Sequence, residues 1–346
     1  MSSRRGRRNR IKHFLIETTK SLFEAGIGKS KYEAFQESYK RNETRQSPVI
    51  YTFSTENRYE KVVANFADFL KQEYGLEYER EFRKLSTEEL YTCVDRYFEK
   101  QQEKNRSEST LKLHISALNK VLSAIDPNIK EYFDADSRAR WRDGVPRGDN
   151  DRYNNPDKIV ENLHKINETS EAIAQLQRLT GARIGDVKKI EIDDKNKKVN
   201  IKDSKGGRSR SVYFDRFPDQ FEKVKEYKEI LDRALEEKKF SDIREDEYYN
   251  DLRKACRKAG EPYRASHAFR FEWAQEKHKE ISQWSKEEQE TYYRRILEER
   301  GKSEKDINKA INDVKERDLI DVAIISEELG HSRIDISLHY LKIKRK

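Results

Sequence analysis

Apolar side chains recur at helical spacing along much of this 346-residue chain, and this periodicity constrains the fold more than any other feature. Behind Ser54, which we predict to be an N-cap, they follow at intervals of three and four. The first such stripe comprises Tyr59, Val62, Val63, Phe66, Phe69 and Leu70. Only 13 glycines and 6 prolines interrupt the chain, so the sequence predicts a mainly α-helical protein rather than a turn-rich β fold.

The composition is unusually polar, with 40% charged and 34% hydrophobic residues, and this makes disorder the first alternative. The 18 tyrosines and 15 phenylalanines argue against disorder, because disordered chains are poor in aromatic residues. The net charge of +8 is compatible with nucleic-acid binding but does not require it.

The chain carries no sign of export or of membrane insertion. No apolar run reaches the roughly 18 residues of a membrane span, and the N-terminus lacks the apolar stretch of a secretory signal. The two cysteines, Cys93 and Cys256, have neither the spacing of a zinc site nor that of a redox pair. We therefore expect a cytoplasmic protein without disulfides.

Breaks in the periodicity divide the chain into four segments. Residues 1–49 are predicted to be a basic N-terminal arm with an extension. Residues 50–140 carry amphipathic helices, one of which begins with a capping box at Ser86. Residues 141–156 combine proline, glycine and charges without periodicity, which is typical of a linker, and residues 157–346 form a second domain.

Arginines in the arm and around the linker are candidates for contacts with a DNA backbone. They are Arg4, Arg5, Arg7, Arg8, Arg10, Arg138, Arg140, Arg142 and Arg147. A flexible basic arm can follow a phosphate backbone or a minor groove. The alternatives are a solubilising tail for the N-terminal group and a solvated linker for the others.

The second domain is predicted to combine helices with a small antiparallel sheet. A helix capped by Ser170 ends at Gly181. Three short β-like runs with turn residues between them follow at 190–192, 198–202 and 210–214. The rest reads as helices, two of which occupy about 278–318 and begin at Ser285 and behind Ser303.

Four separated segments of this domain hold polar residues of types that carry chemistry. The candidates are Arg183, Lys205, His267, Arg270, His331 and Tyr340. His267 and Arg270 are three residues apart and therefore share one helix face. Each segment alone has an ordinary explanation, such as a solvent-exposed turn lysine or a tyrosine that only packs.

Taken together, these residue types are what phosphoryl transfer on DNA without a metal would need. The transition state carries extra negative charge, and paired guanidiniums suit its non-bridging oxygens. A tyrosine is a competent nucleophile once its proton is removed, and a lysine or histidine can protonate the leaving hydroxyl. We therefore expect an enzyme that needs no cofactor and no metal.

The order of these residues resembles that of the tyrosine recombinases, the phage-type integrase family. The resemblance rests on an Arg, a hairpin Lys, His-x-x-Arg, Leu-Gly-His and a Tyr in this order, and it covers about 157–346. It implies the tyrosine recombinase catalytic fold, mainly α with a small antiparallel sheet. Residues 50–140 resemble the family's helical core-binding (SAM-like) domain, through less specific motifs.

The resemblance also implies a role for each residue that would hold the phosphate. Arg183 and Arg270 would clamp the scissile phosphate, and His331 would donate a hydrogen bond to it. Asp186, three residues after Arg183, resembles the family's acidic residue that supports the active site. Its alternative role is that of a charge at a helix N-terminus.

The remaining roles concern proton and strand transfer. By the same resemblance, Lys205 would be the general acid for the 5′-hydroxyl, and His267 would assist proton transfer around the nucleophile. Tyr340 would attack phosphorus and form a 3′-phosphotyrosine. Such enzymes exchange strands of double-stranded DNA as homotetramers through a Holliday junction, in the integration, resolution, inversion or transposition of mobile genetic elements.

The sequence departs from the family pattern in two places. His267 and His331 are 64 residues apart, farther than in most members, because of the helices at about 278–318. These helices are either a peripheral addition or a module that contacts DNA or another protomer. Only six residues follow Tyr340, and we take as a hypothesis that Tyr340 is donated in trans.

Two other functions remain open at this stage. A type IB topoisomerase or a telomere resolvase uses the same chemistry on another substrate geometry. A DNA-binding regulator with a decayed active site would be no enzyme, although all six candidate positions carry the expected residue types. A DNA adduct that resists denaturation would separate the enzymes from the regulator.

Overall fold

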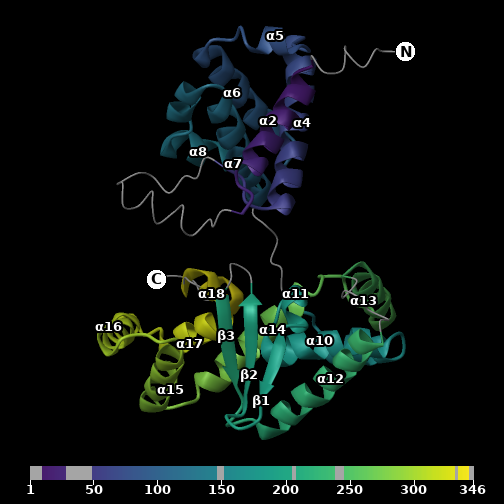
Figure 1. The fold of residues 1–346 in the computed structure, drawn as a ribbon, viewed down its shortest axis with the longest axis vertical. Coiled ribbons are helices and arrows are strands. Elements are labelled where there is room, and N and C mark those ends of the chain that lie inside the picture. Colours follow the sequence, from purple (N-terminus) through teal and green to yellow (C-terminus); the bar gives the residue numbers. More distant parts are fainter. Residues whose placement is uncertain are drawn as a thin grey trace. The chain divides into compact units, whose positions relative to one another are not determined.

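The computed structural model describes residues 10–28, 49–145, 152–204, 208–237, 245–331 and 334–342. Within these ranges the protein is mainly helical, with a small three-stranded antiparallel sheet, as predicted. The chain divides into two compact units, Met1–Gly148 and Asp149–Lys346, each with its own hydrophobic core (Figure 1). None of the described helices is long and apolar enough to cross a membrane.

The first unit consists of helices only. They are α2 (Ile11–Glu24), α4 (Phe53–Tyr74), α5 (Glu79–Phe82), α6 (Thr87–Glu103), α7 (Glu108–Ile125), the 3₁₀ helix η1 (Pro127–Tyr132) and α8 (Ala135–Trp141). The capping box at Ser86 is present, and the Ser86 side chain accepts from the Glu89 amide. Helix α4, however, is capped by Thr52 and not by Ser54, because the helix begins two residues earlier than the stripe indicates.

The N-terminal segment differs from the expected arm in its described part. Residues Ile11 and Leu15 of α2 are buried in the core of the first unit, against α4 and α7. Arg10 forms an ion pair with Glu77 at 3.0 Å, so it is engaged within the unit. The basic residues before this helix led to the prediction of an arm, although Ile11, Leu15 and Leu22 follow helical spacing along the 14 residues of α2.

The predicted linker also differs at both of its described ends. Trp141 is 1% exposed and stacks on Phe98, so it belongs to the core of the first unit. At the other end Tyr153 is equally buried and donates a hydrogen bond to the Ala265 carbonyl within the second unit. Aromatic side chains thus fix both ends of a stretch whose composition alone indicates a linker.

The second unit holds the sheet and most of the candidate site. Its helices are α9 (Pro156–His164), α10 (Glu168–Thr180), α11 (Ile184–Val187), α12 (Pro218–Glu236), α13 (Glu245–Ala259), α14 (His267–Ile281), α15 (Lys286–Glu299), α16 (Glu304–Lys315), α17 (Ile320–Glu328) and α18 (Ile334–Leu341). Helix α10 ends at Gly181 as predicted, but its N-cap is Asn167 rather than Ser170. The serines at 285 and 303 cap α15 and α16, as the sequence predicts.

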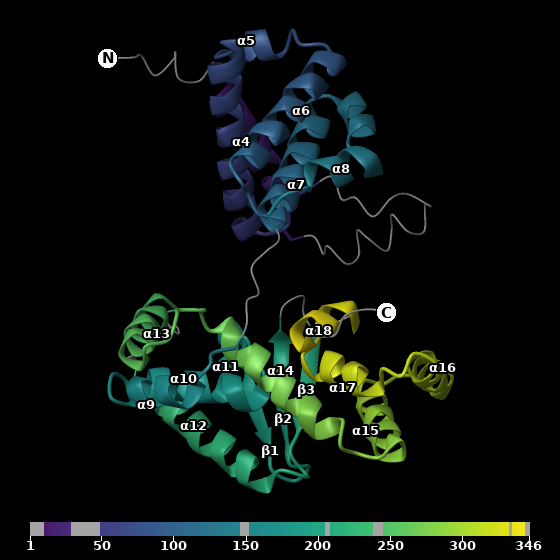
Figure 2. The same cartoon turned by 180° about the vertical axis from the view of Figure 1, so that it is seen from behind.

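The sheet has the order β1 (Ile190–Asp193), β2 (Lys198–Ser204) and β3 (Arg208–Tyr213), with antiparallel neighbours. It lies between α9, α10, α12 and α13 on one side and α15–α17 on the other, as both views show (Figures 1 and 2). Helices α11 and α18 lie along the edge of the unit at which β2 ends. This edge collects the candidate residues.

Candidate active site

Five of the six predicted catalytic residues lie in the described part of the second unit, and they come from separate elements. Arg183 precedes α11, His267 and Arg270 begin α14, His331 follows α17, and Tyr340 lies on α18. Direct contacts connect four of them, and the charge of Arg183 acts on both Arg270 and His331. The fold therefore assembles residues that are up to 157 positions apart in the sequence.

Tyr340 is held mainly by α14. Its ring stacks on Phe271 with centroids 4.3 Å apart, and its Oη lies 2.5 Å from His267 Nε2. A phenol hydroxyl can donate and an imidazole nitrogen can accept, so we assign the phenol as the donor. Tyr340 is only 6% exposed and lies against the residues of its own chain.

Arg270 is the most deeply buried charge of the site, with an exposed fraction of 0%. Its guanidinium donates to the carbonyls of Gly181 and Leu329 and, at 3.2 Å, contacts His331 Nε2. Its Nε has no hydrogen-bond partner among the described residues. Burial and the nearby charge of Arg183 lower the pKa of Arg270 to about 10, so the guanidinium stays charged at neutral pH.

His331 is neutral in this arrangement. Burial, followed by the charges of Arg270 and the other arginines, lowers its pKa to about 3. Because Arg270 can only donate, Nε2 of His331 is the acceptor and Nδ1 carries the proton. Nδ1 therefore donates to Ser337 Oγ at 2.9 Å, and the neutral ring has no second N–H for a phosphate.

Arg183 is held by a short polar chain that ends at Asp186. Its guanidinium donates to Ser204 Oγ at 3.0 Å, and this hydroxyl donates to Asp186 Oδ2 at 2.6 Å. The direct Arg183–Asp186 distance is 3.6 Å. Asp186 is 4% exposed, so it acts as a buried partner of Arg183 through Ser204, the last residue of β2.

Two glycines make the close approach of these elements possible. Gly181 ends α10 with φ +61°, and a Cβ there would lie 2.7 Å from the Trp273 ring of α14. Gly330 has φ +68°, and a Cβ there would lie 2.9 Å from Cδ of Arg210. In both helix-ending motifs the glycine therefore provides room as well as a left-handed turn.

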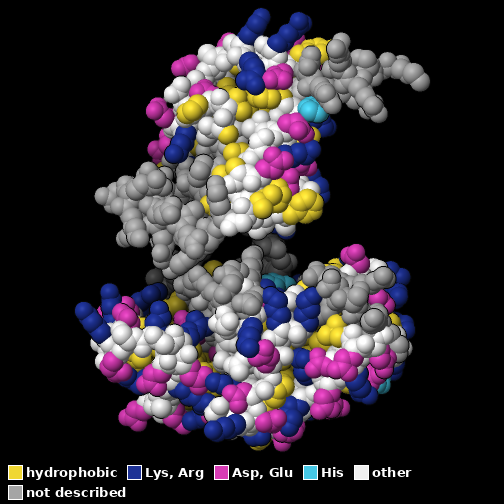
Figure 3. All heavy atoms as spheres, in the orientation of Figure 1, with side chains coloured by type: hydrophobic (Ala, Val, Ile, Leu, Met, Phe, Trp, Pro, Cys, Tyr) yellow, Lys and Arg dark blue, Asp and Glu magenta, His cyan; other side chains and the backbone are white. Residues whose placement is uncertain are grey.

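Several predicted residues lie outside the described ranges or outside this cluster. The former are Lys205, Arg4, Arg5, Arg7, Arg8 and Arg147. In the first unit Arg140 pairs with Asp95 at 2.6 Å, Arg138 is partly buried on the same helix, and Arg142 is exposed. On the face shown in Figure 3, Lys and Arg side chains alternate with Asp and Glu over both units.

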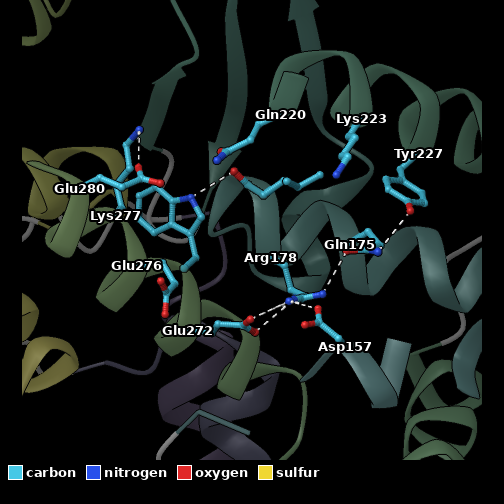
Figure 4. Close-up of a pocket in the computed structure, with 12 residues that line it drawn as sticks. Asp157, Gln175, Arg178, Gln220, Lys223, Tyr227, Glu272, Glu276, Lys277 and Glu280 are labelled. Carbon is cyan, nitrogen blue, oxygen red and sulfur yellow. Dashed lines mark hydrogen bonds and ion pairs between the residues drawn. The ribbon is translucent and has the colours of Figure 1, made fainter. Parts of the chain in front are cut away.

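A cavity of about 350 Å³ lies elsewhere in the second unit, between α10, α12 and α14. Its lining includes a bidentate pair of Arg178 and Glu272, to which Asp157 adds a bond of 2.8 Å (Figure 4). Trp273 and Leu179 also line the cavity. None of the predicted catalytic residues does, so the cavity is separate from the candidate site.

The sequence analysis missed three residues that support the site. Arg210 on β3 is 3% exposed and donates to the carbonyls of Glu328 and Gly181. Ser204 and Ser337 bridge Arg183 and His331 to their surroundings. A signal existed for Arg210 alone, because it shares the strand alternation of Val212 and therefore points to the buried face.

Comparison with protein-family models, with curated proteins and with solved structures finds no match to this chain. Among the described residues, no group of three or more His, Cys, Asp or Glu side chains has an arrangement that could hold a metal ion. The site is therefore interpreted from its own geometry: a buried tyrosine on an imidazole, beside two buried or half-buried guanidiniums.

Proposed function

We propose that this chain is an enzyme that breaks and rejoins DNA strands through a 3′-phosphotyrosine, in the manner of a tyrosine recombinase. The observation that carries the proposal is the 2.5 Å contact of Tyr340 Oη with His267 Nε2, next to Arg270 and His331. A phenol becomes a strong nucleophile when an adjacent base takes its proton.

The proposed reaction balances without an external energy source. Oη of Tyr340 attacks phosphorus while its proton moves to Nε2 of His267, and the bond from phosphorus to the 5′ oxygen breaks. The 5′ oxygen leaves as a hydroxyl with a proton that the family resemblance assigns to Lys205. Attack of a 5′-hydroxyl from another strand on the phosphotyrosine reverses these steps and gives strand exchange.

The guanidiniums supply the charge that the transition state requires. Arg270 has five N–H donors, of which three are engaged in the bonds described above, so donors including Nε–H remain for a phosphate. The Arg183 side chain is about a quarter exposed, and it comes from the start of α11, whereas Arg270 comes from α14. A phosphate oxygen near Nε2 of His331 would raise the pKa of that ring and make it a donor.

The test is a trapping experiment on duplexes of randomised sequence that carry a nick, so that a short 5′-hydroxyl fragment diffuses away after cleavage. We expect the wild-type protein to form an adduct that survives denaturant, and Tyr340→Phe to form none. Tyr263→Phe is the matched control, because Tyr263 lies in the same unit and is 40% exposed. No adduct with the wild type, or an equal adduct with Tyr340→Phe, would refute the proposal.

If adducts form, two further readouts define the substrate geometry. Sequencing of the trapped duplexes gives the symmetry and spacing of the site, which a tetrameric recombinase requires. Exchange of strands between two labelled duplexes is expected. Relaxation of supercoiled plasmids that lack the site, without exchange, would assign the chain to the topoisomerase class.

A further inference from the structure

Arg210 occupies a strand position that the fold reserves for apolar side chains. It pairs across the sheet with Ile201, which is fully buried. It also lies on the same face of β3 as Val212, two residues further on, which is buried as well. A charged side chain in such a place costs free energy unless polar partners satisfy it. The guanidinium of Arg210 therefore has to serve interactions that an apolar residue cannot make.

Arg210 donates to the C-terminal ends of the same two helices, α10 and α17, to which Arg270 also donates. Arg210 donates to the carbonyl of Glu328 and, at 3.3 Å, to that of Gly181. Arg270 donates to the same Gly181 carbonyl and to Leu329, the residue after Glu328. Two guanidiniums from β3 and α14 thus join the end of α10 to the end of α17.

These two ends lead directly into the candidate catalytic residues. Gly181 is two residues before Arg183, and Glu328 is three residues before His331. Gly330 lies between Glu328 and His331, and a Cβ at this position would collide with the side chain of Arg210. The position of the aliphatic part of Arg210 is therefore part of the geometry of the turn that presents His331.

Two carboxylates and two helix ends balance the charge of Arg210, and the carboxylates are those of Asp186 and Glu328. Both acceptor carbonyls lie at helix C-termini, which carry partial negative charge. Burial and the neighbouring Arg270 lower the pKa of Arg210, because two guanidiniums lie close together in a dry environment. An anion bound near Arg270 and Arg183 would relieve this repulsion.

We infer that Arg210 is a positioning residue for the proposed phosphoryl transfer, fixing the Arg183 segment against the His331 turn. This inference rests on the proposed function. Arg210 does not have to touch the phosphate, because it acts through the carbonyls that it shares with Arg270. Its loss is expected to slow the chemical step while DNA binding persists.

The experiment compares wild type, Arg210→Met, Arg210→Lys and the control Arg295→Met in single-turnover cleavage at saturating protein. Arg295 suits as a control because it lies over Tyr213 of the same strand and is partly exposed. Rates are normalised by the final amount of adduct, so loss of folded protein lowers the amplitude and not the rate. Amide hydrogen exchange at Gly330 and His331 provides a readout that does not depend on activity.

A small displacement of catalytic groups costs about 100-fold in rate, and we expect a loss of this order for Arg210→Met, with DNA affinity unchanged. Arg210→Lys keeps the charge but not the planar fork, so its loss is smaller. Exchange at Gly330 and His331 accelerates in Arg210→Met only. Should Arg210→Met fail to fold, Arg210→Lys decides the question by the same normalised rate.

The outcomes separate the two claims. Absence of an adduct from the wild type refutes the proposed function, and unchanged amide exchange in Arg210→Met then refutes the positioning role as well. If the wild type forms the adduct, a normalised rate for the Arg210 variants equal to that of wild type, or an equal loss in Arg295→Met, overturns the inference about Arg210.

Discussion

Acidification should lower the free energy of unfolding of the second unit through protonation of His331, and the substitution His331→Gln should remove this effect. The folded ring has a pKa of about 3 against an ordinary 6.5, because it is buried among arginines. The unfolded chain therefore binds a proton that the folded chain does not, and stability falls as the pH drops below 6.5. At pH 4.5 the difference is two pH units, which corresponds to about 3 kcal/mol.

The assay is calorimetric unfolding of the full chain at several pH values, for wild type and for His331→Gln. Carboxylates and the buried His114 of the first unit titrate in both proteins, so they cancel in the comparison. Between pH 6 and pH 4 the wild type should lose about 1.4 kcal/mol more per pH unit than His331→Gln. Parallel pH profiles would refute the assignment of a neutral His331 held by Arg270.

Three further predictions concern the surroundings of the site. Tyr292→Phe removes the hydroxyl that donates to buried Glu328 at 2.7 Å, so the free energy of unfolding should fall by about 1–3 kcal/mol in calorimetry, and an unchanged value would contradict the bond. Gly181→Ala adds a Cβ 2.7 Å from an α14 ring and should cost about 1–3 kcal/mol from overpacking alone, measured in the same way. Mixing Arg183→Ala with Tyr340→Phe should restore no adduct, because Tyr340 contacts its own chain; recovery would favour donation in trans.

Local signals account for the parts of the fold that could be predicted. The caps at Ser86, Ser285 and Ser303 are correct because a capping side chain bonds amides only two or three residues away. The prediction of a basic arm failed at α2, although Ile11, Leu15 and Leu22 follow helical spacing there, and α4 and α7 cover this stripe.

The candidate site shows the same division. His267 and Arg270 were identifiable because their spacing places them on one helix face. The strand alternation could have marked Arg210 as buried, but it could not identify the acceptors of Arg210, which are backbone carbonyls 29 and 118 residues away. Likewise, no local pattern indicates that Ser204 connects Arg183 to Asp186, because β2 and α11 meet only in the folded unit.

The central claim, that Tyr340 is the nucleophile, is tested most directly by the chemical identity of the bond to DNA. The trapped adduct is digested with nuclease and protease, and the modified peptide is sequenced by mass spectrometry. Our account predicts a nucleotide joined through its 3′ phosphate to Tyr340 and to no other residue. A nucleotide on a different side chain, or a phosphate linked through the 5′ oxygen, would contradict it.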